Sequence, residues 1–169
     1  LTVSTGGGNI SVGNTGGVTK VTTGGGNVAI GKVNGAAVIT TGGGDIKVDG
    51  VSGEVKSVTG SGNVSIVSNE DQVNVVSGAG DVFVTFHPGT SGESKIVTGY
   101  GNIKLYIPEN SKTTIVAKIK GKYWADSKDD EGFKSDFPNT TVNKEGNSIT
   151  TVYQLNGGGS DVYVETGSG

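Results

Sequence analysis

Two aspartates are the first candidates for chemistry in this sequence. Asp45 and Asp81 each follow a Gly-x-Gly phrase, and if copies of that phrase stack as neighbouring β-strands, two layers would separate the carboxylates by about 9.6 Å. That distance lies at the upper edge of the range used by inverting glycosidases. Asn63 follows the copy between them. Because Asn and Asp both suit turns, we interpret the position as structural and keep a carbohydrate-active protein as the alternative function.

The other residues that could do chemistry occur in patterns that fit catalysis or metal binding poorly. His87 is the single histidine, and the sequence contains no Cys and no Gly-x-Ser-x-Gly phrase. The stretch at 42–48, GGGDIKV, is similar to calcium-binding nonapeptides, but four of six copies of the phrase carry neutral Asn instead of Asp. A phosphate-binding glycine loop occurs once, between a strand and a helix. We therefore predict no catalytic residue, no metal and no cofactor.

A cluster of aromatic side chains near the C-terminus is the best candidate for binding. Tyr123, Trp124, Phe133 and Phe137 are interleaved with Lys and Asp residues. Such a cluster can form a platform for the sugar rings of a cell-surface glycan or for an envelope protein. Alternatively, it covers the open end of a stacked β-fold, as terminal repeats must.

These candidates are positioned by an internal repeat. The phrase Thr/Ser-Gly-x-Gly-Asn/Asp-Ile/Val, here called the anchor phrase, occurs six times, and its first five copies begin 18 residues apart. Its two Gly positions suit a sharp turn, because Gly adopts positive φ without steric cost. The middle position accepts even Tyr, so it is expected to point outward. The copies begin at Thr5, Thr23, Thr41, Thr59, Ser77 and Thr98.

Apolar and polar residues alternate within each unit, which is the signature of half-buried strands. One apolar column contains Val3, Val21, Ile39, Val75 and Ile96, with Ser57 as the exception. Further columns begin at Ile10 and Val12. Columns with one residue per repeat form when the repeats stack as coils about 4.8 Å apart. We therefore predict an all-β fold, a single-stranded parallel β-helix (β-solenoid) with 18-residue coils.

The pattern changes near residue 107. Regular coils are expected over 1–107, and residues 108–169 are expected to complete the same domain as a wider C-terminal coil or cap. Strands are predicted over 111–120, 148–155 and 161–165. The segment 121–147 interrupts the repeat with aromatic and acidic residues.

The composition excludes several classes of protein. Gly supplies 32 of 169 residues, Met is absent, no Arg occurs and the net charge is −3. A nucleic-acid binder is not expected, because phosphate neutralisation and base reading rely on basic side chains. No apolar stretch approaches the ~20 residues of a membrane span. The absence of Met leads us to expect that a leader was removed.

The order of motifs resembles a known family. The anchor phrases are followed by Ile107-Pro108, by SDFP at 135–138, by LNGGG at 155–159 and by VYVETGSG at 162–169. This order resembles the bacterial adhesin-like repeat domains of unknown function described as DUF4097-like. The resemblance implies a β-helical domain in an exported or membrane-tethered envelope protein, located in the periplasm, at the cell surface or outside the cell.

Together these observations predict a non-enzymatic structural or interaction module of the bacterial envelope. The first strand, at residues 1–5, has no preceding repeat in this sequence. Edge-to-edge self-association through the N-terminal coil is therefore also expected.

Overall fold

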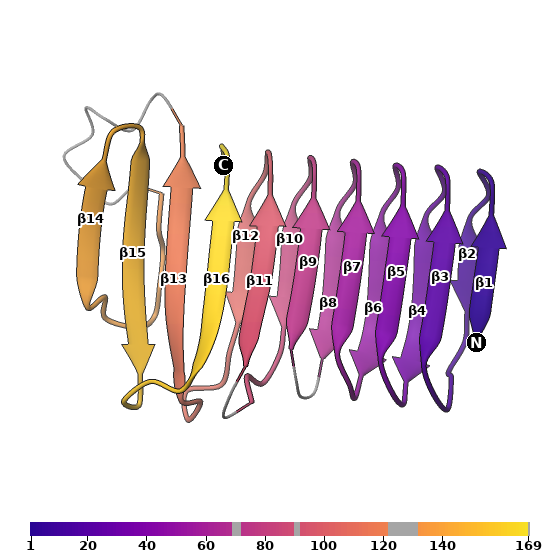
Figure 1. The fold of residues 1–169 in the computed structure, drawn as a ribbon, viewed down its shortest axis with the longest axis horizontal. Coiled ribbons are helices and arrows are strands. Elements are labelled where there is room, and N and C mark those ends of the chain that lie inside the picture. Colours follow the sequence, from indigo (N-terminus) through magenta and orange to yellow (C-terminus); the bar gives the residue numbers. More distant parts are fainter. Residues whose placement is uncertain (69–71, 90–91, 122–131, 169) are drawn as a thin grey trace.

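The computed structural model describes residues 1–68, 72–89, 92–121 and 132–168, which form strands and no helix. Each coil contributes one strand to each of two sheets, here called sheet A and sheet B (Figure 1). In sheet A these strands are β1 (Thr2–Thr5), β3 (Thr19–Thr23), β5 (Ala37–Thr41), β7 (Val55–Thr59), β9 (Val73–Ser77) and β11 (Glu93–Thr98). In sheet B they are β2 (Ile10–Val12), β4 (Val28–Val33), β6 (Ile46–Val51), β8 (Val64–Ser68), β10 (Val82–Thr85) and β12 (Ile103–Tyr106).

Neighbouring coils pair in parallel and in register. Val3 lies opposite Val21, and Ile10 lies opposite Val28, so each residue meets its equivalent in the next repeat. The predicted parallel β-solenoid with 18-residue coils is confirmed, with about six turns.

The predicted apolar columns form the core between the two sheets. Val21, Ile39, Val75 and Ile96 are fully buried, and so are Val28, Ile46, Val64 and Val82 of sheet B. Ser57 takes its place in the same column and is also fully buried, and its hydroxyl has no hydrogen-bond partner. Two apolar faces pressed together supply the main driving force for this architecture.

Two hydrogen-bond ladders hold the anchor phrases of successive coils together. In the first ladder, hydroxyls donate to glycine carbonyl oxygens of the preceding coil over 2.8–3.2 Å. The donors are Thr23, Thr41, Thr59, Ser77, Thr98 and Thr166. In the second, here called the Asn/Asp ladder, each Oδ1 accepts the backbone N–H of the equivalent residue one coil later, over 2.7–2.9 Å. The acceptors are Asn9, Asn27, Asp45, Asn63 and Asp81.

The first Gly of the anchor phrase is required by close stacking. A Cβ at these positions would lie 2.0–2.4 Å from a carbonyl oxygen of the preceding coil. The positions are Gly24, Gly42, Gly60, Gly78, Gly99 and Gly167. None of these glycines has a positive φ, so the expectation of positive φ is wrong for this column. It holds for the last Gly of three coils, Gly62, Gly80 and Gly101. The outward direction of the middle position is confirmed, since Tyr100 is 67% exposed.

The C-terminal part extends sheet A only. It contains β13 (Thr113–Lys120), β14 (Thr141–Glu145), β15 (Ser148–Leu155) and β16 (Ser160–Thr166). The last strand, β16, lies between β11 and β13 and is parallel to both, whereas β15 and β14 follow as antiparallel neighbours (Figure 1). The predicted C-terminal strands are present. β14 and the return of β16 to the solenoid were not predicted.

Candidate functional site

The two aspartates of the repeat belong to the Asn/Asp ladder. Asp45 Oδ1 accepts the N–H of Asn63 at 2.7 Å, and Asp81 Oδ1 accepts the N–H of Asn102 at 2.8 Å. Both side chains lie on the exposed turn side of their coils. One oxygen of each carboxylate is thus engaged in holding neighbouring coils together, which is the structural role that the alternation of Asn and Asp indicated.

The remaining titratable candidates do not form a cluster in the described part of the structure. His87 is exposed in the loop that follows β10. Among the residues that the structure describes, no group of three or more His, Asp or Glu side chains could hold a metal ion.

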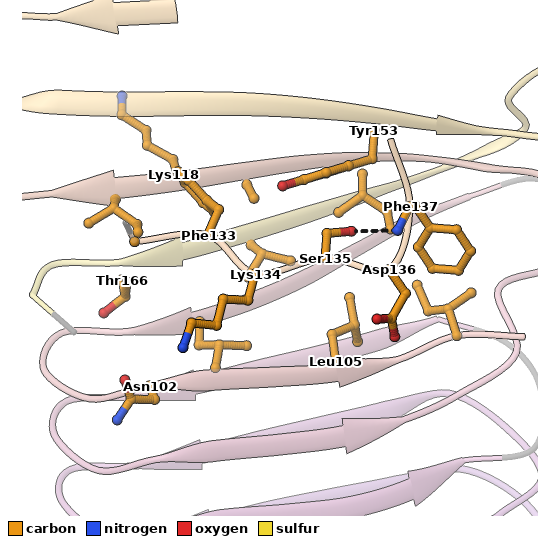
Figure 2. Close-up of a pocket in the computed structure, with 17 residues that line it drawn as sticks. Asn102, Leu105, Lys118, Phe133, Lys134, Ser135, Asp136, Phe137, Tyr153 and Thr166 are labelled. Atoms are coloured by element: carbon orange, nitrogen blue, oxygen red, sulfur yellow. Dashed lines mark hydrogen bonds between the residues drawn. The ribbon is translucent and has the colours of Figure 1, made fainter. Parts of the chain in front are cut away.

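The unequal lengths of the sheets create a groove at the C-terminal end of the solenoid. Among the strands that the structure describes, β12 is the last of sheet B, while sheet A continues through β16, β13, β15 and β14. The segment 132–137 crosses the uncovered inner face of sheet A opposite β12 (Figure 2). Between them lies a cavity of about 220 Å³, here called the terminal groove. Its apolar lining comprises Ile103, Leu105, Ile107, Ile115, Ala117, Ile119, Phe133, Phe137, Tyr153 and Val164.

Two of the four predicted aromatic residues line this groove. Phe133 and Phe137 are half-buried and pack against the hydrophobic core, on the wall that faces β12. The backbone N–H of Phe137 donates to Ser135 Oγ at 3.0 Å, which bends the segment between them (Figure 2). Tyr123 and Trp124 lie outside the described residues. The structure thus places Phe133 and Phe137 on the same groove beside β12.

The outer rim of the groove carries residues that sequence reasoning missed. A hollow of about 1070 Å³ lies between β12 and the segment 132–137, and its rim includes Lys104, Tyr106, Glu109, Lys134 and Asp136. The ring of Tyr106 packs against that of Phe83, with centroids 5.3 Å apart, and both rings remain exposed. The two residues belong to neighbouring outward columns: Phe83 follows Ser11, Ala29, Lys47 and Ser65, whereas Tyr106 lies opposite Thr85. The change to aromatic side chains in the last two coils was the signal available in the sequence.

A charged cluster occupies the outer face of sheet A beside β16. Burial raises the pKa of the Glu165 carboxyl, but hydrogen bonds from Lys120 and Tyr163 and the charges of Lys120 and Lys118 outweigh it, so this pKa lies below its ordinary value. Burial, together with the hydrogen bond to Glu165 and its charge, raises the pKa of Tyr163 to about 12. Lys95 lies 5.9 Å from the centre of the Tyr163 ring. These contacts tie β16 to β11 and β13.

The geometry can be set against known proteins. The described part of the chain contains no helix long and apolar enough to cross a membrane. Searches of curated proteins and of solved structures gave no match. The family described as Toastrack DUF4097 matches residues 1–168, and the chain therefore belongs to the Toastrack DUF4097 family.

Proposed function

We propose that this chain is an exported, non-enzymatic interaction module of the bacterial cell envelope and that it binds its partner at the terminal groove. The observation that carries the proposal is the cavity beside β12, the last strand of sheet B in the described part of the chain, with apolar side chains on its walls. Concave sites with apolar walls and a few polar groups are the usual places for ligands.

The regular coils favour a scaffold over an enzyme. Their anchor side chains are engaged in ladders, as Thr41 is with Gly26 and Asp45 with Asn63. Catalysis by paired carboxylates requires two acidic groups that converge on a substrate. An acidic side chain that accepts a hydrogen bond from a backbone N–H in a repeated turn, as Asp45 does, already has a structural role.

The proposed export is supported by the family resemblance, which implies an exported or membrane-tethered envelope protein. We extend that location to this chain. Fractionation of the bacterium that produces the protein tests it: the protein is expected in the periplasmic, surface or extracellular fraction. Recovery with the cytoplasmic enzymes alone would contradict the proposed location.

Site-specific photo-cross-linking tests the proposed binding surface. A photoreactive phenylalanine analogue replaces Tyr106, at the rim of the hollow, or Tyr100, which is exposed on a turn outside its lining. In the producing bacterium we expect discrete adducts from position 106 and none from position 100. Equal adducts from both positions, or none from position 106, would overturn the assignment of the groove.

Carbohydrate binding is the second candidate, and the exposed Phe83–Tyr106 pair favours it. Sugar rings pack on aromatic faces, and Glu109 and Asp136 on the same rim could accept hydrogen bonds from hydroxyl groups. On a glycan array, a specific signal should disappear in Tyr106→Ala and persist in the control Tyr100→Ala. Trp124→Ala probes the predicted platform residue outside the described part. A signal unchanged in Tyr106→Ala would count against the rim.

We also propose self-association through the N-terminal coil. The edges of β1 and β2 have no neighbour within the described residues. Lys20 N–H donates to Leu1 O and Gly24 N–H to Thr5 O. Thr22 lies between these two donors in the same alternation and is opposite Ser4, so the Ser4 N–H faces the unpaired edge. Sedimentation should give a mass that rises toward a dimer with concentration, and Ser4→Pro should remain monomeric, since Pro is tolerated at strand edges but blocks pairing. A wild-type monomer at every concentration would contradict this.

A further inference from the structure

We infer that a second cavity, beside β15, is a binding site for one neutral sugar ring. The cavity has a volume of about 230 Å³ and lies between the segment 133–139 and the inner face of β15, and it is here called the β15 pocket. Its lining comprises Phe133, Ser135, Phe137, Pro138, Asn139, Thr151 and Tyr153. None of these residues belongs to β12 or β16, so the inference does not depend on the function proposed for the terminal groove.

The observation that points to a ligand is an unpaired hydroxyl group. Thr151 is 1% exposed, and its Oγ1 has no hydrogen-bond partner among the described residues. Thr151 lies at the inner end of the pocket, whereas the polar side chains of Ser135 and Asn139 are exposed at its mouth. A buried hydroxyl without a partner costs free energy. A bound molecule that offers this hydroxyl a donor or an acceptor removes that cost.

The other buried hydroxyl without a partner has different surroundings. Ser57 lies opposite Ile39 and Val75, within an apolar column of the core. It lines none of the cavities described above. Thr151 is therefore set apart by the combination of an unpaired hydroxyl with a cavity, and Ser57 provides a matched control for it.

The lining of the β15 pocket indicates the kind of ligand. Phe133 and Phe137 contribute rings from the segment that crosses the inner face of sheet A, and Tyr153 contributes a third ring from β15 (Figure 2). The Ser135 hydroxyl and the Asn139 carboxamide offer hydrogen-bond donors and acceptors. None of the described lining residues is charged, so a neutral ligand is favoured. A sugar ring presents C–H groups to aromatic rings and hydroxyl groups to neutral polar atoms.

The size of the pocket limits the ligand to one ring. Pockets for drug-sized ligands have volumes of roughly 300–1,000 Å³, and the β15 pocket, at about 230 Å³, is smaller. Water is the alternative occupant. An ordered buried water makes about three hydrogen bonds, whereas three of the lining side chains are aromatic rings. A sugar ring contacts those rings and also reaches the Thr151 hydroxyl.

Nuclear magnetic resonance with the complete chain tests the site. The probes are methyl β-D-glucopyranoside, methyl α-D-mannopyranoside, methyl β-D-galactopyranoside and N-acetyl-D-glucosamine. At least one probe should give a saturable saturation-transfer signal. Titration with it should shift the methyl resonance of Thr151 and leave that of Thr41, which is buried in the hydroxyl ladder. No saturable binding of any probe, the result expected if water alone occupies the pocket, would overturn the inference, and so would equal shifts of the two methyl groups.

Substitutions then test the unpaired hydroxyl. Thr151→Val keeps the shape of the side chain, and it should weaken binding of the sugar about fivefold, the factor for one neutral hydrogen bond. Its urea midpoint should not decrease, because Val leaves no unpaired hydroxyl. Ser57→Ala removes the other unpaired hydroxyl and should leave binding unchanged. Asn139→Ala, at an exposed position, should also weaken binding. Equal affinities of the wild type and Thr151→Val would refute the assignment.

Two comparisons distinguish this site from the rim of the terminal groove and identify the source of the sugar. Tyr106→Ala should leave the affinity unchanged, whereas a loss in Tyr106→Ala without a loss in Thr151→Val would place the sugar at the rim and overturn the inference. A disaccharide with the same terminal sugar should bind as well if the ligand is the end of a glycan, and should not bind if it is a free sugar. Cross-linking from position 106 tests the proposed function separately, so either proposal can fail alone.

Discussion

Replacement of Gly42 by Ala would measure how strongly close stacking of the coils stabilises the solenoid. A Cβ at this position would lie 2.2 Å from the carbonyl oxygen of Gly24 in the preceding coil. Ordinary contacts of this kind begin near 3.4 Å, so the two turns must separate by more than 1 Å. Two hydrogen bonds resist that separation, Gly42 N–H to Thr23 O at 3.1 Å and Thr41 Oγ1 to Gly26 O at 2.9 Å.

The expected loss follows from these contacts. Each broken hydrogen bond removes roughly 1 kcal/mol, and overpacking in a close-packed region costs roughly 1–3 kcal/mol. Alanine also lowers the conformational entropy of the unfolded chain, which stabilises the folded state by about 0.4–1 kcal/mol. Gly42→Ala should therefore lower the free energy of unfolding by about 2–5 kcal/mol.

Two matched variants isolate the steric effect. Gly6 occupies the same anchor position in the first coil and Gly25 the middle position of the second coil, and a Cβ at either would meet nothing within 4 Å. Both alanine variants should be neutral or more stable by up to about 1 kcal/mol. Urea unfolding followed by circular dichroism measures all three. If Gly42→Ala costs no more than Gly6→Ala, close stacking is not what selects glycine in this column.

Three further changes in stability are expected. Asp45→Ala should lower the free energy of unfolding by about 1 kcal/mol and Asp45→Asn should not, because both Asp and Asn supply the Oδ1 that Asn63 N–H needs; urea midpoints compare them. Because the pKa of Glu165 is lowered in the folded state, this residue stabilises the fold at pH values above the ordinary carboxyl pKa. The free energy of unfolding should therefore decrease as the pH is lowered from the ordinary carboxyl pKa to the pKa of folded Glu165, and it should decrease less steeply in Lys120→Met. The raised pKa of Tyr163 predicts that stability falls as pH rises from about 10 to about 12, and Tyr163→Phe should remove this loss.

The regular coils could be predicted from the sequence because every repeat carries the same pattern of apolar, polar and Gly residues. Val21 and Ile39 share a column with Ile96, and all three are fully buried. Period-2 alternation identifies the strands, and a constant repeat length fixes which residues face one another. The direction in which the anchor hydroxyls bond could not be read in this way, since Thr41 could have paired with other Thr residues instead of Gly26.

The terminal groove was beyond prediction because it arises from strand order. Sequence order suggests that the strand at 148–155 precedes that at 160–166 along the sheet as well. Instead β16 returns to β11, and β13 and β15 lie farther out. The sequence around Val164 does not distinguish the two strand orders, because an apolar residue at this position suits both. The groove exists only because this return lengthens sheet A while sheet B stops at β12.

The ladders that make the solenoid predictable also favour its ends over its internal coils as the place of the proposed binding. In an internal coil, the edge groups of each strand, the anchor hydroxyl and the Oδ1 of the Asn/Asp ladder are all satisfied by the coils on either side, as those of Asp81 are. Such a coil gains no specificity from its backbone, and its outward side chains alone can differ. Among the described residues, β12 has no further neighbour in sheet B, so the proposed binding is expected at this edge and not along the internal coils.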